Sequence, residues 1–201
     1  NKLHGGLMNL ETGEARSRDS ITSKIDGVAV DDLARRFGSP LYVYSEGTMK
    51  KAFRSLHRSL STRYPDVALA WSYKTNYLNA VCQTFHHEGA WAEVVSEMEY
   101  EKALALGVKP EFIVFNGPYK PVRALEKAVR RGSIINVDHL DEIEDLEKIA
   151  LRLGRKVPMG IRINMDAGIQ PVWSRFGFNL ESGQALEAIL RIHRNGLLDL
   201  K

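Results

Sequence analysis

Strand-like and helix-like patterns alternate along most of this chain. Apolar runs with strand character begin near Val67, Trp91, Phe112, Ser133, Val157 and Leu197. The first four intervals between them are 24, 21, 21 and 24 residues, and segments with helical spacing fill each interval. This alternation predicts a parallel sheet of βα units. The even spacing favours a closed (β/α)8 barrel over a doubly wound sheet, and no Gly-x-Gly-x-x-Gly motif follows a strand.

Three of the helical patterns have well-defined ends. They cover residues 97–106, 140–153 and 184–193. A glycine terminates each of the three patterns, as is common at helix C-termini, and Asp138 is expected to be the N-cap of the second helix.

The N-terminal part follows a different pattern. A short helix is predicted over residues 28–37, with acidic residues in its first turn and Gly38 after its end. Leu41–Tyr44 is predicted to be a strand. A basic amphipathic helix is predicted from Glu46 to about Thr62. Its basic side lacks interleaved aromatic residues, so we expect that side to face solvent rather than nucleic acid or a membrane.

The number of strands is too small for a complete barrel. A (β/α)8 barrel needs eight strands and about 250 residues, whereas this chain has 201 residues and ends within the sixth strand-like run. Six strands would leave two sheet edges open. We therefore expect this chain to be the N-terminal portion of a longer protein, in which another part covers the open side.

Composition narrows the class of protein. The net charge is +3 and the basic residues are spread evenly, so no nucleic-acid partner is expected. The single cysteine, Cys82, lies in an apolar helical pattern, which predicts a packing role and a reducing, cytoplasmic location. No apolar run approaches the about 18 residues of a membrane span, and no pair of histidines has metal-ligand spacing. The chain begins with Asn1, so N-terminal residues are expected to be missing.

A lysine follows the first of the regularly spaced strands. The run Val67–Tyr73 ends at Lys74, and side chains in a strand alternate between its two faces. If Lys74 points into the barrel, the small residues Ser72 and Ala70 do so too, and the larger ones face the helices. The carboxyl ends of barrel strands carry the chemistry, and a desolvated lysine amine forms Schiff bases. The alternative is an exposed lysine without a functional role.

Polar residues also follow other strands. The second strand leads through Glu93 to Ser96 and Glu99, and the third ends at Asn116. Arg162 lies within an apolar strand, where a buried guanidinium needs an anion or another acceptor. It is therefore a candidate to bind a phenolate, phosphate or carboxylate. The alternative is an internal salt bridge with a carboxylate such as Glu93.

Several of these segments together resemble one family. Ser72–Asn76 resembles the Tyr-Lys-Ala-Asn signature of the alanine-racemase-like, fold-type III pyridoxal-phosphate-dependent decarboxylases, and Glu93–Glu99 resembles their Asp-Val-Val-Ser-x-x-Glu run. Further similar segments are Ile113–Pro118, Ile135–Asp138, Arg162–Asn164 and Ser174–Gly177. The resemblance covers about residues 28–201 and is strongest to diaminopimelate decarboxylases.

The resemblance implies a fold, a cofactor and a reaction. Residues 46–201 would form an incomplete barrel that binds pyridoxal 5'-phosphate, and residues 1–45 would contribute to a β-domain. Lys74 would be the catalytic residue and form the internal aldimine during decarboxylation of an amino acid. The implied cofactor-binding residues are Lys74, Arg162, Glu93, Ser96, Glu99 and Asn116. The full-length protein would be a homodimer.

The sequence also departs from the family pattern. Glu93 stands where the family has aspartate, and the loop 166–174 lacks a histidine-bearing insert, which leaves the substrate amino acid open. The ring-stacking histidine, the glycine-rich phosphate loop, the glutamate for the ring nitrogen and the product-protonating cysteine would all follow Lys201. We therefore expect the fragment alone to be inactive. Two alternatives are an amino-acid racemase of the same fold and a non-catalytic pyridoxal-phosphate-binding barrel protein.

Overall fold

The computed structural model describes residues 22–168 and 175–201. The chain divides into two compact units, Asn1–Ser45 and Glu46–Lys201. Ser174, in one of the family-like segments, lies outside the described residues.

The first unit contains a small hairpin and a helix. Strands β1 (Lys24–Ile25) and β2 (Val28–Ala29) pair antiparallel. The residues between them, Asp26 and Gly27, have φ of 46° and 83°, as a two-residue hairpin turn requires. Helix α1 (Val30–Phe37) follows and confirms the predicted helix. The hairpin was not predicted, although its Asp-Gly pair is a strong hairpin signal.

The predicted strand at Leu41–Tyr44 is wrong for this chain. These residues have no strand assignment, and no strand in residues 22–168 or 175–201 pairs with them. Tyr42 is 90% exposed. A β-strand exists through hydrogen bonds to a neighbouring strand, so an apolar, alternating segment without such a neighbour remains irregular.

The second unit repeats a strand and a helix along the chain. Its regular elements before the sixth sheet strand are α2 (Glu46–Ser61), β3 (Ala70–Ser72), α3 (Asn79–His87), β4 (Trp91–Val94), α4 (Glu97–Ala105), the 3₁₀ turn η1 (Pro110–Phe112), β5 (Ile113–Phe115), α5 (Val122–Arg131), β6 (Ile134–Val137), α6 (Leu140–Leu153), β7 (Val157–Ile161), β8 (Ile163–Asn164), β9 (Phe178–Asn179) and α7 (Gln184–Asn195). Strand β10 (Leu198–Leu200) is the last element.

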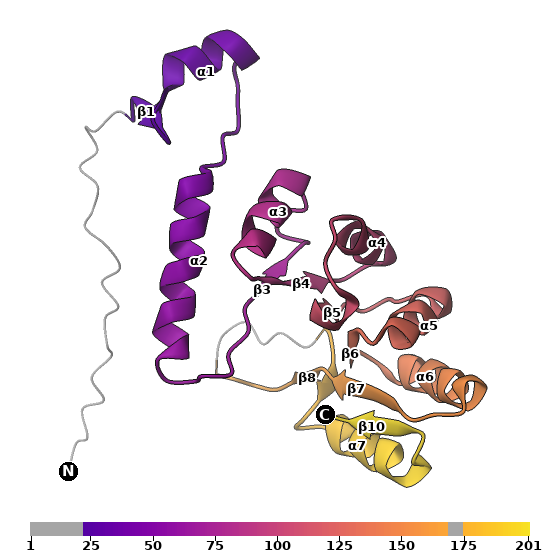
Figure 1. The fold of residues 1–201 in the computed structure, drawn as a ribbon. Helices are drawn as coiled ribbons and strands as arrows, with labels where there is room; N and C mark the ends of the chain where they lie inside the picture. Colours follow the sequence, from indigo (N-terminus) through magenta and orange to yellow (C-terminus); the bar gives the residue numbers. More distant parts are fainter. Residues whose placement is uncertain (1–21, 169–174) are drawn as a thin grey trace, which may run out of the picture. The chain divides into compact units, whose positions relative to one another are not determined.

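Six of these strands form one parallel sheet in the order β10-β7-β6-β5-β4-β3. Neighbours in the sheet are therefore successive strands of the βα repeat. Figure 1 shows helices α3 to α7 following one side of the curved sheet. This is the arrangement of consecutive units of a (β/α)8 barrel, and it confirms the predicted incomplete barrel.

A second, two-stranded parallel sheet was not predicted. Strands β8 and β9 pair directly after β7, through a bond from Phe178 N to Arg162 O of 2.7 Å. The pairing brings the segment at 175–180 back to the end of β7.

The core lies between the sheet and its helices. Every second residue of β4 is fully buried, namely Ala92 and Val94, while Glu93 between them faces the other side. Helix α6 contributes a stripe of buried residues that includes Ile143 and Leu146. Cys82 belongs to the same core, which confirms its predicted packing role.

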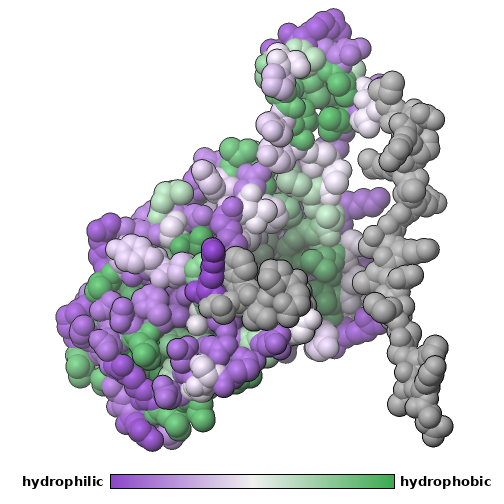
Figure 2. Space-filling model, turned by 180° about the vertical axis from the view of Figure 1, so that it is seen from behind, coloured by the Kyte–Doolittle hydropathy of each residue, from purple (hydrophilic) through white to green (hydrophobic). Residues whose placement is uncertain are grey.

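The basic helix α2 packs through its apolar side, as predicted. Met49 and Phe53 contact the cluster that contains Phe85 of α3. On the other side the basic residues Lys51 and Arg58 are exposed. Figure 2 shows polar side chains over much of the visible face of this unit, with small apolar patches between them. None of the helices in the described part of the chain is long and apolar enough to cross a membrane.

The position of a leucine on α6 should decide how strongly its removal destabilises the protein. Leu146 is 0% exposed and Leu151, on the same helix, is 66% exposed. Leu146→Ala should lower the free energy of unfolding by about 2–5 kcal/mol, because it leaves a cavity in the core. Leu151→Ala should change it by less than about 0.5 kcal/mol. Urea unfolding of both variants tests this, and equal effects would contradict the assignment of the buried stripe.

Candidate functional site

A pocket of about 290 Å³ lies at the carboxyl ends of the parallel strands. Its lining residues are Lys74, Glu93, Val95, Asn116, Gly117, Asn136, Asp138, Ile161 and Arg162. All of them lie at or just beyond the ends of β3 to β7, where a barrel carries its functional groups. Four of the predicted site residues, Lys74, Glu93, Asn116 and Arg162, are therefore brought together.

A row of hydrogen-bonded polar side chains crosses the floor of this pocket. Ser72 Oγ donates to Glu93 Oε2, and Asn116 Nδ2 donates to Glu93 Oε1 at 2.9 Å. Asn136 Nδ2 then donates to Asn116 Oδ1 at 2.7 Å. Each residue comes from a different βα unit, from β3 to β6. Because both carboxylate oxygens of Glu93 accept hydrogen bonds, its side chain has a fixed orientation.

A glycine on β7 leaves room for the end of the row. A Cβ atom at Gly160 would lie 2.4 Å from Asn136 Oδ1. Asn136 can therefore take its place at the β6 end of the row only because the neighbouring position on β7 has no side chain. Asn136 and Gly160 were not predicted as site residues, although each lies near the end of a strand.

Lys74 lies on the wall of the pocket, and the residues before it alternate as predicted. Trp71 stacks on Phe85 of α3 with ring centroids 3.9 Å apart, and Tyr73 is fully buried. Ser72 points to the opposite side, toward Glu93. Lys74 is exposed, so its amine is open to the pocket rather than desolvated as the sequence suggested.

Arg162 is held at the rim by an acid and an aromatic ring. Its Nη1 donates to Asp138 Oδ1 at 3.1 Å, and its guanidinium lies 4.9 Å from the centre of the Phe176 ring. The expectation of a buried arginine is wrong, because the side chain emerges beyond the end of β7 and is 41% exposed. Its carboxylate partner is Asp138 rather than Glu93, whose oxygens are engaged in the row.

Asp138 has a different role from the predicted one. The N-cap of α6 is His139, so the prediction that Asp138 caps this helix is wrong. Its carboxylate is turned to the pocket instead, where it accepts from Arg162 and from Gly177 N at 3.3 Å. Asp138 is 6% exposed, and a buried carboxylate needs such partners.

Ser96 and Glu99 lie next to the pocket but not on its wall. Ser96 Oγ accepts from Glu99 N at 3.2 Å, and Glu99 Oε2 accepts from Val95 N at 2.8 Å. This reciprocal pair resembles a capping box and begins α4. Burial raises the pKa of Glu99, as does the nearby charge of Glu93. Their binding of a cofactor stays a prediction, while their contacts position Val95.

Gly117 is required by the close approach of two backbone segments. Its φ is 99°, and a Cβ atom there would lie 2.4 Å from Val95 O. The β5–α5 loop can therefore pass over the β4–α4 joint only with glycine at this position.

Gly117 and Gly132, which lie before and after α5, provide a matched test. Gly132 also has a positive φ, of 79°, but nothing lies within 4 Å of its potential Cβ. Gly132→Ala should cost about 1 kcal/mol of stability from backbone strain alone. Gly117→Ala should cost more, because the Val95 carbonyl must also move. Equal losses in urea unfolding would show that the close approach is absent.

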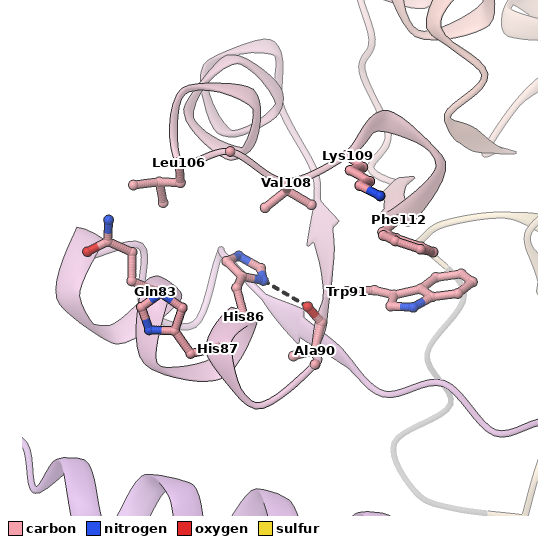
Figure 3. Close-up of a pocket in the computed structure, with 11 residues that line it drawn as sticks. Gln83, His86, His87, Ala90, Trp91, Leu106, Val108, Lys109 and Phe112 are labelled. Carbon is pink, nitrogen blue, oxygen red and sulfur yellow. Dashed lines mark hydrogen bonds between the residues drawn. The ribbon is translucent and has the colours of Figure 1, made fainter.

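A larger cavity of about 500 Å³ lies at the opposite, amino-terminal ends of the strands. Figure 3 shows His86, Trp91 and Phe112 around it. The rings of Trp91 and Phe112 are 5.3 Å apart. None of the predicted site residues lines this cavity. Within the described residues, no group of three His, Cys, Asp or Glu side chains could hold a metal ion.

His86 connects this cavity to the strand that precedes Lys74. Its Nδ1 lies 2.8 Å from Ala90 O, which can only accept, so Nδ1 carries the proton (Figure 3). Nε2 therefore accepts from Tyr73 Oη at 2.8 Å. Burial raises the pKa of Tyr73, which keeps this donor protonated. The bond fixes Tyr73, which directly follows β3 and precedes Lys74.

The stability of the protein should depend on the protonation of His86. Burial lowers the pKa of His86, the bond to Ala90 raises it, and the charge of His87 lowers it further. The pKa of His86 is therefore lower in the folded protein than in the unfolded chain. The contribution of neutral His86 to the free energy of unfolding is complete above about pH 6.5 and is lost as the pH falls through the folded pKa. Urea unfolding at about pH 7.5 and about pH 5 measures this dependence. Between these two pH values the free energy of unfolding should fall less for His86→Gln than for the wild type.

The exposed His193 on α7 provides the control for this measurement. His193→Gln should keep the wild-type dependence on pH, since its ring lies in solvent. An unchanged dependence in His86→Gln would contradict the assigned bonding.

The fold and the pocket define a protein of the βα-barrel class with a polar pocket at the carboxyl ends of its strands. Residues 49–200 match the family described as pyridoxal-dependent decarboxylase, pyridoxal binding domain. This match covers more than half of the chain, so the chain belongs to that family. The predicted resemblance to fold-type III decarboxylases is confirmed.

Individual relatives agree with the family. The chain is 32% identical to diaminopimelate decarboxylase of Aquifex aeolicus over 80% of its own length, and 34% identical to that of Vibrio cholerae over 69%. A solved structure of diaminopimelate decarboxylase from M. jannaschii in complex with L-lysine has a TM-score of 0.79 at 27% identity, covering 88% of this chain and 44% of that one. The chain spans 39% and 33% of the lengths of the two curated relatives.

Proposed function

We propose that this chain belongs to an enzyme that decarboxylates an amino acid with pyridoxal phosphate, and that Lys74 is its catalytic lysine. The observation that carries the proposal is the position of Lys74 at the end of β3, on the wall of the pocket. Residues 49–200, which match the pyridoxal-binding domain, include every residue that lines the pocket.

The pocket residues fit this cofactor chemically. Lys74 offers an exposed primary amine, and Arg162 offers a guanidinium at the rim. When bound, pyridoxal phosphate supplies an aldehyde that an amine can attack and a ring that takes up the electrons of the bond between the substrate Cα and its carboxylate as that bond breaks. Lys74 would hold the cofactor and move a proton at its Nζ.

The other pocket residues would bind and orient. Glu93 and Asn116 are fixed in the polar row and would present oriented oxygen and amide groups to the ligand. Arg162, held by Asp138, would attract an anionic or oxygen-bearing group. Ser96 and Glu99 would act from behind, by fixing the Val95 backbone.

The substrate is proposed from the relatives. Those described above are named diaminopimelate decarboxylases, and the M. jannaschii structure contains L-lysine. We therefore infer that the substrate is an α-amino acid similar to diaminopimelate. The loop 166–174, whose sequence differs from that of diaminopimelate decarboxylases, includes residues 169–174, which are outside the described part.

The remaining expectations belong to the whole protein. We propose that residues 1–45 contribute to a β-domain, that the complete protein is a cytoplasmic homodimer, and that the present chain alone is inactive.

Reductive labelling tests the catalytic lysine directly. The complete gene product would be incubated with pyridoxal phosphate, reduced with borohydride, and digested for mass spectrometry. The label should lie on Lys74. Lys74→Ala should lose the label and reduce turnover to below about a thousandth of wild type, because the nucleophile and its proton transfer are both removed. Lys51→Ala, at an exposed position on α2, should retain both.

Product analysis separates the proposal from its alternatives. Release of carbon dioxide from an amino acid supports a decarboxylase, whereas an inverted enantiomer would identify a racemase of the same fold. Label on Lys74 without turnover of any amino acid would favour a non-catalytic pyridoxal-phosphate-binding protein.

A further inference from the structure

A buried ion pair lies behind the pocket. Lys120, before α5, and Glu142, in the first turn of α6, have side chains that are only 0% and 3% exposed, with Nζ and Oε1 2.8 Å apart. Burial lowers the pKa of Lys120, and the adjacent Glu142 raises it in compensation. Neither residue touches the pocket. Apolar residues often replace such pairs without loss of stability, so a stabilising role alone does not account for this one.

Each member of the pair has a second contact, and both contacts lead to the pocket wall. Lys120 Nζ donates to Gly117 O at 2.6 Å, and Glu142 Oε2 accepts from Asp138 N at 2.9 Å. Gly117 and Asp138 line the pocket. The carboxylate of Asp138 in turn holds Arg162. One ion pair therefore joins the β5–α5 loop, the end of β6 and the arginine at the rim.

A comparison with the start of α4 shows what Lys120 contributes beside Glu142. Glu99 stands at the third position of α4, as Glu142 does in α6, and accepts in the same way from the residue before its N-cap. In the part of the chain that the structure describes, no lysine or arginine forms a salt bridge with Glu99. The backbone contact of such a glutamate thus does not require a cation. The specific contribution of Lys120 is the link to Gly117 O.

We propose that Lys120 and Glu142 are positioning residues for the pocket, a role that rests on the proposed binding of pyridoxal phosphate there. Their ion pair sets the distance between the β5–α5 loop at Gly117 and the residue Asp138, whose carboxylate holds Arg162. It thereby sets the shape of the pocket that the cofactor would enter. Neither residue contacts the cofactor.

A neutral double variant with a matched control tests this role in the complete gene product. Lys120→Met with Glu142→Gln removes both charges but keeps an acceptor for Asp138 N. Lys127→Met with Glu101→Gln removes an exposed ion pair between α5 and α4. The first variant should raise the dissociation constant of pyridoxal phosphate about tenfold to a hundredfold, because small displacements of positioned groups weaken binding to this extent. The second should leave it unchanged.

Hydrogen exchange measures the same effect without the cofactor. Peptides covering residues 113–121 and 134–142 should exchange faster in the Lys120/Glu142 variant, while the melting temperature of both variants stays near that of wild type. If the Lys120/Glu142 variant does not fold, Lys120→Arg, which keeps the charge beside Glu142 but displaces the donor, should still weaken cofactor binding.

The outcomes separate this inference from the proposed function. If wild type does not bind pyridoxal phosphate, the proposed function fails, and the exchange of residues 113–121 alone decides whether the pair positions the loop. If wild type binds and the Lys120/Glu142 variant binds equally well with unchanged exchange, the positioning role is overturned.

Discussion

The alternation of side chains along short parallel strands is the constraint on which both the core and the pocket depend. In β4 it directs Val94 toward the helices and Glu93 toward the opposite face. Because the strands run in one direction, their carboxyl ends meet at one edge. One polar residue from each of the four units from β3 to β6 is then enough to build a continuous row. Hydrogen bonds between neighbours, such as that from Asn136 to Asn116, fix this row within the protein itself.

Features with local causes could be predicted from the sequence. Apolar runs and terminating glycines depend on a few adjacent residues, and the six barrel strands begin within about three residues of the predicted positions. The same logic identified Lys74 at a strand end. Leu41–Tyr44 shows the limit, since its pattern is that of a strand but none of the strands in residues 22–168 and 175–201 pairs with it.

Features that depend on distant residues could not be predicted. Arg162 was expected to be buried because its sequence neighbours are apolar, yet its environment is decided by Asp138 and Phe176. Lys120 and Glu142 look like ordinary surface charges in the sequence. They become buried only where α5 and α6 pack side by side against the sheet. Their importance is therefore visible only in three dimensions.

The backbone of the pocket wall is fixed largely from outside the pocket. Glu99 and Glu142 each accept from the residue before a helix N-cap, which holds Val95 and Asp138 from the helix side. Gly117 then packs directly on the Val95 carbonyl, with no room for a side chain between them. None of these three contacts involves a side chain that faces into the pocket. The backbone of the wall therefore depends on glutamates that do not themselves line the pocket, so a change outside the pocket can alter the site without replacing any residue on its wall.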